Sequence, residues 1–380
     1  MAKEYYFIFY SALAVILLID AKLAGKGRWR ERSLSLASSK GLLGFSAAGI
    51  MLHHMSQTIY FAGEDTGILL FMVDIGVCFV GIFFFFSGYG LYTSLREKPD
   101  YLKGFLFRRL TTVLVPFYVC NFTFIAGSCL WGYKLQKGEL APYAAGVVLM
   151  NSQMWYLVEI AILYVLFYLA FRFIKNRNAA CAAFCISVLV MIGVSLLLGH
   201  DTTTPTQGLW FHGEWWYNAT AMMPVGVLFA RWEKQILSFV RRYYVMTLFV
   251  MVCLTAFFYN RTMYMLRHTG YWYEWEGYSG YKEKAQTLAV QFPFIFFTVM
   301  TVIVILQKLE FGNRILDFLG SIALELYLIH NLYILYLPIQ NRVFYIIGVY
   351  AASIATAWLL HKADRKLIEM VLKIGRKEKL

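Results

Sequence analysis

Long apolar stretches, separated by short polar segments, run through almost the whole chain. A helix of about 20 residues crosses the hydrocarbon core of a bilayer, and eleven stretches are candidates for such helices. Their approximate bounds are 5–20, 41–61, 68–95, 107–131, 153–174, 179–199, 215–231, 243–259, 285–306, 315–337 and 343–361. The pattern predicts an all-α polytopic membrane protein with about eleven transmembrane helices.

The first stretch, 5–20, is short enough to resemble the core of a signal peptide. Its basic residues follow the apolar run, beginning at Lys22, whereas a signal peptide carries them before it. We therefore expect an extra N-terminal helix and a basic loop over 1–39, a single membrane domain over 40–361, and a basic tail over 362–380.

The distribution of Lys and Arg predicts the orientation, because cytoplasmic loops retain basic residues and translocated loops are depleted of them. Alternate segments hold 27 of the 35 basic residues. These segments are 20–40, 95–110, 172–178, 231–242, 307–314 and 361–380. The N-terminus is therefore expected outside and the C-terminus in the cytoplasm.

The net charge and the cysteines indicate which partners and which kinds of site the chain is expected to have. The net charge is +13, but the basic residues are dispersed over short loops between spans, which favours contact with membrane lipids over binding of nucleic acid. All six cysteines lie within predicted spans and form no CxxC pair. The sequence therefore indicates neither a disulfide framework nor a metal site.

The run from Leu326 to His330 places an imidazole inside an apolar stretch, where a titratable group is costly unless it is used or paired. Other titratable side chains fall at a similar distance from the outer ends of their spans, roughly 9–12 Å deep at the helical rise per residue. They are His53, His54, Asp74 and Glu159. We expect them to line one polar cavity in the outer half of the membrane.

Imidazoles and carboxylates at one depth favour proton transfer, and an oriented histidine can activate a hydroxyl nucleophile. The alternative is that each residue makes a structural polar contact between helices. Of the adjacent pair, His53 continues a small or polar stripe with Ser46, Gly49, Ser56 and Tyr60, which favours it weakly over His54.

Further candidates lie nearer the two faces of the membrane. Arg108 and Arg109 stand at the cytoplasmic mouth of one span and could grip phosphate oxygens, or they could simply follow the charge rule for cytoplasmic loops. Glu325 and Asn331 could line the cavity. Aromatic residues with carboxylates in 260–284 suit stacking on sugar rings, or an aromatic belt at the interface.

Four motifs occur in a fixed order. They are Phe83 to Tyr89 with Ser87-Gly88 inside, Arg109 seven residues before Pro116, Trp155-Tyr156-Leu157, and Leu319-Gly320 leading to Tyr327-Leu328-Ile329-His330. Together with the histidine on the second span, they resemble the acyltransferase 3 family of bacterial integral-membrane acyltransferases. The resemblance covers about 40–360.

The resemblance implies a ten-helix core in the bacterial cytoplasmic membrane. Such a core passes an acyl group, usually acetyl, from cytoplasmic acyl-CoA to a hydroxyl of a carbohydrate or lipid-linked glycan at the outer face. It implies that the catalytic histidine is His53 or His54, which we expect Glu159 or Asp74 to orient. It also implies Arg109 in the donor site, where we expect Arg108, Lys40 and Ser87 as well. The later histidine of the family matches His330, and we expect Trp155, Asn331 and Glu325 beside it on the acceptor side.

Three positions depart from the family pattern. Leu42 and Leu43 stand where an arginine usually precedes the histidine, Thr112 replaces a second arginine, and Ala323 replaces a serine. Arg108 and Lys40 are therefore expected as substitutes in holding the phosphates of the donor. Two rival functions are a proton-coupled secondary transporter, for which inverted repeats are lacking, and a glycolipid flippase.

Overall fold

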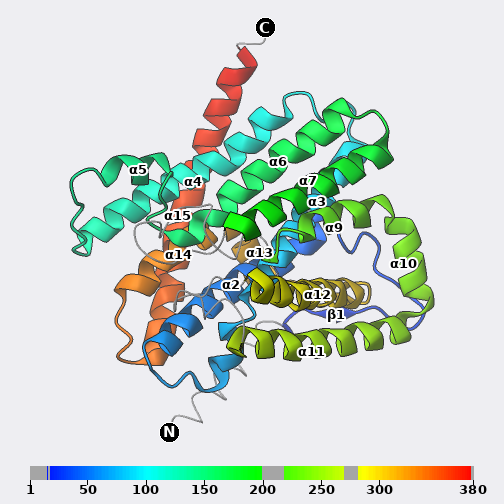
Figure 1. The fold of residues 1–380 in the computed structure, drawn as a ribbon, viewed down its shortest axis with the longest axis horizontal. Coiled ribbons are helices and arrows are strands. Elements are labelled where there is room, and N and C mark those ends of the chain that lie inside the picture. The colour runs from blue at the N-terminus through cyan, green and yellow to red at the C-terminus, as the bar shows by residue number, and fades with distance from the viewer. Residues whose placement is uncertain (1–14, 16–17, 199–217, 269–280, 378–380) are drawn as a thin grey trace.

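The computed structural model describes residue 15 and residues 18–198, 218–268 and 281–377, and these form a bundle of helices (Figure 1). The helices are α2 (Leu36–Phe61), η1 (Gly67–Val73), α3 (Gly76–Glu97), α4 (Phe105–Leu130), α5 (Leu140–Ala145), η2 (Ser152–Met154), α6 (Trp155–Phe173), α7 (Arg177–Leu198), α9 (Met222–Arg231), α10 (Glu233–Arg242), α11 (Tyr244–His268), α12 (Tyr281–Leu306), α13 (Arg314–Ser321), α14 (Ala323–Tyr336) and α15 (Arg342–Lys377). Two short strands, β1 (Lys22–Leu23) and β2 (Leu309–Glu310), pair antiparallel.

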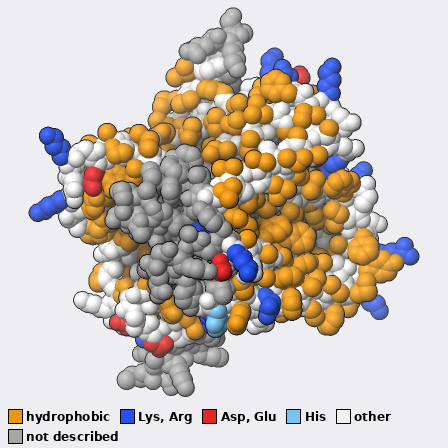
Figure 2. Space-filling model, viewed as in Figure 1, with side chains coloured by type: hydrophobic (Ala, Val, Ile, Leu, Met, Phe, Trp, Pro, Cys, Tyr) orange, Lys and Arg blue, Asp and Glu red, His pale blue; other side chains and the backbone are white. Residues whose placement is uncertain are grey.

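Seven helices in the described part of the chain are long and apolar enough to cross a membrane: α3, α4, η2 with α6, α7, α11, α12 and α15. The pair α13 and α14 makes an eighth candidate if it counts as one span. Figure 2 shows a broad hydrophobic face, with most Lys and Arg side chains near its margins. The chain is therefore an all-α polytopic membrane protein, as the apolar pattern predicts.

Several predicted spans take a form that the apolar pattern does not reveal. The 68–95 stretch begins as the 3-10 helix η1, and within 215–231 the helix α9 has only ten residues. The 315–337 stretch breaks at Ile322, where α13 and α14 meet at an angle of 82°. Most of 5–20 lies outside the described residues.

Helix α2 is 26 residues long but is not among the seven apolar spans. Its hydropathy is lower because it carries histidine, serine and glutamine, and it can carry them because half of its residues are buried among other helices. It packs mainly on α13, α3 and α14 (Figure 1). A central helix that contacts protein rather than lipid can hold polar side chains at low cost.

Helices α3 and α9 pack more extensively than any other pair among the described elements. Two glycines allow this, because a Cβ at Gly88 would lie 2.0 Å from the carbonyl oxygen of Met223, and one at Gly226 would lie 2.1 Å from that of Phe85. The glycine of the Phe83 to Tyr89 motif therefore serves close approach of two backbones.

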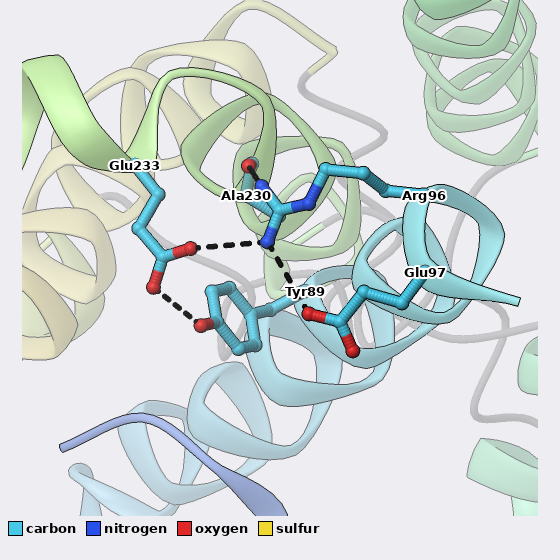
Figure 3. A network of polar contacts seen from close by, with 5 residues as sticks. All are labelled: Tyr89, Arg96, Glu97, Ala230 and Glu233. Carbon is cyan, nitrogen blue, oxygen red and sulfur yellow. Dashed lines mark hydrogen bonds and ion pairs between the residues drawn. The ribbon is translucent and has the colours of Figure 1, made fainter. Parts of the chain in front are cut away.

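Polar contacts fasten the end of α3 to the junction between α9 and α10 (Figure 3). The hydroxyl of Tyr89 donates to Glu233 over 2.6 Å, and Arg96 donates to the carbonyl oxygen of Ala230 over 2.9 Å. Arg96 also pairs with Glu233 at 3.4 Å. These bonds fix the end of the bundle at which α3 stops and α4 begins.

Candidate functional site

Three imidazole rings from α2 and α14 meet inside the bundle. The ring centres of His53 and His54 are 4.8 Å apart, and those of His54 and His330 are 5.3 Å apart with the rings stacked. His330 has no exposed surface. The structure therefore brings together the three histidines that the sequence places at a similar depth.

Backbone carbonyl groups set the tautomer of two of these rings. His53 Nδ1 lies 2.7 Å from the carbonyl oxygen of Met72, and His330 Nδ1 lies 2.7 Å from that of Tyr327. A carbonyl oxygen only accepts, so each Nδ1 carries the proton and donates it. Each Nε2 then keeps a lone pair, the form that a general base or a nucleophile requires.

The side chain of Gln57 holds His54. Its Oε1 lies 3.3 Å from His54 Nδ1, and its Nε2 donates to the carbonyl oxygen of Val73 over 3.2 Å. The second bond orients the amide so that its oxygen faces the imidazole, and His54 Nδ1 therefore also acts as the donor. This contact is longer than the one that holds His53.

The first residue of α3 leaves room for the His53 ring. A Cβ at Gly76 would lie 2.1 Å from His53 Cδ2 and 2.6 Å from Nε2, well inside van der Waals contact. No residue larger than glycine therefore fits at this position with the ring where it stands.

A cavity of about 150 Å³, here called the histidine cavity, includes His53 and His54 in its wall. Its other polar lining residues are Gln57, Asp74, Gln153, Trp155, Asn218, Gln291 and Tyr327. Trp155 and Asp74, both candidates from the sequence, therefore share a cavity with the histidine pair. Within the described part of the chain, no group of three His, Cys, Asp or Glu side chains is arranged to hold a metal ion.

The two carboxylates have partners other than the histidines. Glu159 has no exposed surface and accepts a hydrogen bond from the hydroxyl of Thr220, and Asp74 lies 3.9 Å from Arg267. Neither makes a hydrogen bond to His53 or His54 among the described contacts, and the Met72 carbonyl group orients His53 instead.

Two further cavities adjoin the histidine cavity, one toward each end of the bundle. The first, here called the α15 cavity, has a volume of about 370 Å³ and shares Ile50, Val80 and Tyr327 with the histidine cavity. The second, here called the η1 cavity, has a volume of about 520 Å³ and shares Val73, Asp74 and Leu266 with it. The three cavities therefore lie in series, with the histidine pair in the middle one.

A family model described as an acyltransferase domain, that of the acyltransferase 3 family, matches residues 36–362, which is nearly the whole chain. The chain belongs to the acyltransferase 3 family. Searches of curated proteins and of solved structures gave no match. The match confirms the resemblance carried by the four motifs, and it makes the protein a membrane acyltransferase.

In this acyltransferase, Arg109 lies between the α15 cavity and the surface. It donates to the Tyr101 hydroxyl over 2.7 Å, and its guanidinium lies 6.0 Å from the ring centre of Tyr101 and 5.9 Å from that of Tyr164. Tyr164 lines the α15 cavity. Tyr101 lines an open basin of about 850 Å³ at the α3–α4 loop, here called the basic basin. Arg109 is thus placed to contact a ligand that occupies both.

The other residues that the sequence predicts to bind the acyl donor have different surroundings. Arg108 donates to the backbone carbonyl groups of Tyr101 and Lys103, so it braces the loop before α4. Lys40 packs against Gly320, a residue of the α15 cavity wall. Ser87 lies near Tyr156 and Tyr164, which also line that cavity.

The two polar candidates on α14 point to different places. Asn331 donates to Asn151 over 3.0 Å, and Asn151 in turn donates to the carbonyl oxygen of Leu328, so this pair links the start of η2 to α14. Glu325 lies in the wall of the α15 cavity and pairs with His361 at 3.0 Å. Glu325 is therefore on the opposite side of Tyr327 from the histidine pair.

Several cavity residues were not foreseen from the sequence. His361, Asp364 and Arg365 line the α15 cavity from α15, which continues to Lys377 instead of ending near 361. Their spacing of three and four residues on a helix was the signal available, because such residues share one face. The aromatic residues from Tyr271 to Tyr278, for which the sequence favours either stacking on sugars or an aromatic belt, lie outside the described residues.

Proposed function

We propose that this protein transfers an acyl group from acyl-CoA, bound at the basic end of the bundle, to a hydroxyl of a carbohydrate or lipid-linked glycan that enters at the opposite end. The observation that carries the proposal is the series of three cavities with the histidine pair in the middle one. The donor could then enter from one face of a bacterial cytoplasmic membrane and the acceptor from the other, and the two would meet at His53.

The donor side fits a ligand with a charged head and a long, thin arm. The basic basin is lined by Lys98, Lys103, Arg172 and Arg177, which suit the phosphates of the nucleotide. From there Arg109 contacts Tyr164 in the wall of the α15 cavity, and Tyr327 belongs to the same wall. We assign the nucleotide to the basin and the thioester end to the Tyr327 wall, and we take acetyl as the acyl group because the family resemblance implies it.

The acceptor side offers aromatic and polar groups together. Tyr60 and Phe61 line the η1 cavity and are about half exposed, and Asp74 and Arg267 form an ion pair beside them. Sugar rings stack on aromatic faces while their hydroxyls need hydrogen-bond partners. We therefore assign the acceptor to the η1 cavity, with its reacting hydroxyl pointing toward the histidine cavity.

The chemistry follows from the free Nε2 of His53. In direct transfer, Nε2 takes the proton of the acceptor hydroxyl, whose oxygen attacks the thioester carbonyl carbon. The carbon–sulfur bond then breaks, and the leaving thiolate takes the proton from the imidazolium to give free CoA. In the alternative relay, Nε2 itself attacks the thioester and the acyl-imidazole then passes the acyl group to the acceptor.

The test uses purified protein reconstituted in liposomes with acetyl-CoA labelled in the acetyl group. We expect label to pass to water or to an added glycan, and His53→Ala to lower the rate by about a hundredfold or more, as removal of a catalytic base does. His54→Ala should reduce the rate less, and His268→Ala, an exposed histidine on α11, should leave it unchanged.

Two results would overturn the proposal. One is the absence of both acetyl transfer and saturable CoA binding in the wild type. The other is full activity of both the His53→Ala and the His54→Ala variant at normal expression, which would move the chemistry elsewhere in the chain.

A further inference from the structure

Three titratable side chains gather on the wall of the α15 cavity, away from the histidine pair. Glu325 comes from α14, and His361 and Asp364 come from α15, one helical turn apart. His361 Nδ1 lies 3.0 Å from Glu325 Oε1. Asp364 lines the same cavity as these two side chains. None of the three has a part in the acyl-transfer steps above.

Asp364 is the least expected member of this cluster. Only 1% of its surface is exposed, and neither carboxylate oxygen has a hydrogen-bond partner among the described residues. A buried carboxylate is costly unless donors satisfy it. Because Asp364 lines the cavity, a ligand in that cavity can supply the donors that the protein does not.

The rest of the wall limits what such a ligand can be. Most of it is apolar, including Phe83, Pro116 and Ile160, so the polar cluster is a local feature of an otherwise hydrophobic cavity. Arg365, which is exposed, stands one residue beyond Asp364 on the same wall. The ligand chemistry that fits is a slender apolar chain with amide N–H or hydroxyl groups part-way along it.

We propose that Glu325, His361 and Asp364 form the subsite that holds the amide-bearing pantetheine arm of the donor. The carboxylates of Glu325 and Asp364 accept hydrogen bonds from the amide and hydroxyl groups of the arm. His361 is held by Glu325 and so keeps that carboxylate in place. This proposal rests on the proposed function, because it takes the donor to be an acyl-CoA.

Binding of the arm and binding of the nucleotide can be measured separately, because pantetheine and adenosine 3′,5′-diphosphate each represent one part of CoA. Binding of CoA, of pantetheine and of adenosine 3′,5′-diphosphate is measured by titration calorimetry on the purified full-length protein. Asp364→Leu, which removes the charge and both hydrogen-bond acceptors, should weaken the binding of CoA and of pantetheine by about tenfold or more, since bonds to a charged group are lost. The same variant should leave the affinity for adenosine 3′,5′-diphosphate unchanged.

Arg109→Ala should give the opposite pattern. It should weaken the binding of CoA and of the diphosphate and leave the affinity for pantetheine unchanged. Glu369→Leu removes an exposed carboxylate on the same helix and should change none of the three affinities. If Asp364→Leu does not accumulate, Asp364→Asn keeps the shape and should show the same selective loss at smaller magnitude.

The outcomes separate the two proposals. Unchanged pantetheine affinity in Asp364→Leu or Asp364→Asn, or an equal loss for all three ligands, would overturn the arm subsite while leaving the proposed function intact. Absence of CoA and pantetheine binding in the wild type would overturn both.

Discussion

At the scale of single residues, the contact between His53 and Gly76 leaves no space for a larger side chain at position 76. The Met72 carbonyl group fixes the His53 ring from one side, and the backbone of Gly76 closes on it from the other. The ring has little freedom to reorient, which is what a base that must meet a hydroxyl needs. Glycine at the start of α3 thus has a role in placing a side chain of α2.

Gly76→Ala should therefore impair acyl transfer while the protein still folds. The added methyl group would lie 2.1 Å from His53 Cδ2, so the ring must move, and a displacement of about 1 Å can cost about a hundredfold in rate. The measurement is the rate of acetyl release from acetyl-CoA, together with CoA affinity, which should not change. Gly90→Ala, with nothing within 4 Å of the added Cβ, is the matched control.

At the scale of helices, the packing of α3 on α9 depends on glycines at their closest approach. Gly88 faces the Met223 carbonyl group, whereas Gly90, two residues further along α3, faces open space. The same substitution at these two positions therefore has different consequences, although both are glycines of one helix.

Gly88→Ala should lower the melting temperature of the detergent-solubilised protein, because overpacking of a tight contact costs about 1–3 kcal/mol. Gly90→Ala should leave it unchanged or raise it, since alanine favours a helix over glycine by up to about 1 kcal/mol. Equal melting temperatures for the two variants would contradict the packing described for α3 and α9.

The helices also show where prediction from sequence reached its limit. Apolar runs located α4, α6, α7 and α12 closely, because lipid-facing helices must be hydrophobic along their length, whereas α11 continues to His268, beyond its predicted end at 259. The similar depths of His53, His54 and His330 in their spans predicted that they lie together, because an imidazole is costly when it faces lipid. These depths did not reveal the break at Ile322 or the true partners of Glu159 and Asp74, which depend on tertiary contacts between distant segments.

At the scale of the whole molecule, the bundle is hollowed toward both ends, and the two outer cavities reach the histidine cavity from opposite sides. The basic residues of the α3–α4 loop mark one end, and the end of α2 marks the other. The charge rule for cytoplasmic loops predicts which end faces the cytoplasm.

Cysteine labelling in sealed vesicles can check this sidedness. In a Cys253→Ser background, which removes the exposed thiol among the described cysteines, Thr112→Cys places a thiol in the α15 cavity and Leu70→Cys places one in the η1 cavity. A membrane-impermeant maleimide should label Thr112→Cys only in inside-out vesicles and Leu70→Cys only in right-side-out ones. Labelling of both from one side would exclude the two-sided arrangement.

The residues shared by the α15 and histidine cavities, Ile50, Val80 and Tyr327, have an electrical consequence. The voltage across an energised membrane falls mainly across the layer that excludes water, and between two adjoining cavities that layer is thin. When water fills both cavities, the wall between them is the insulator on which the field concentrates. Any charge that crosses it, including a proton that accompanies a leaving group, moves through a large share of the membrane potential in a single short step.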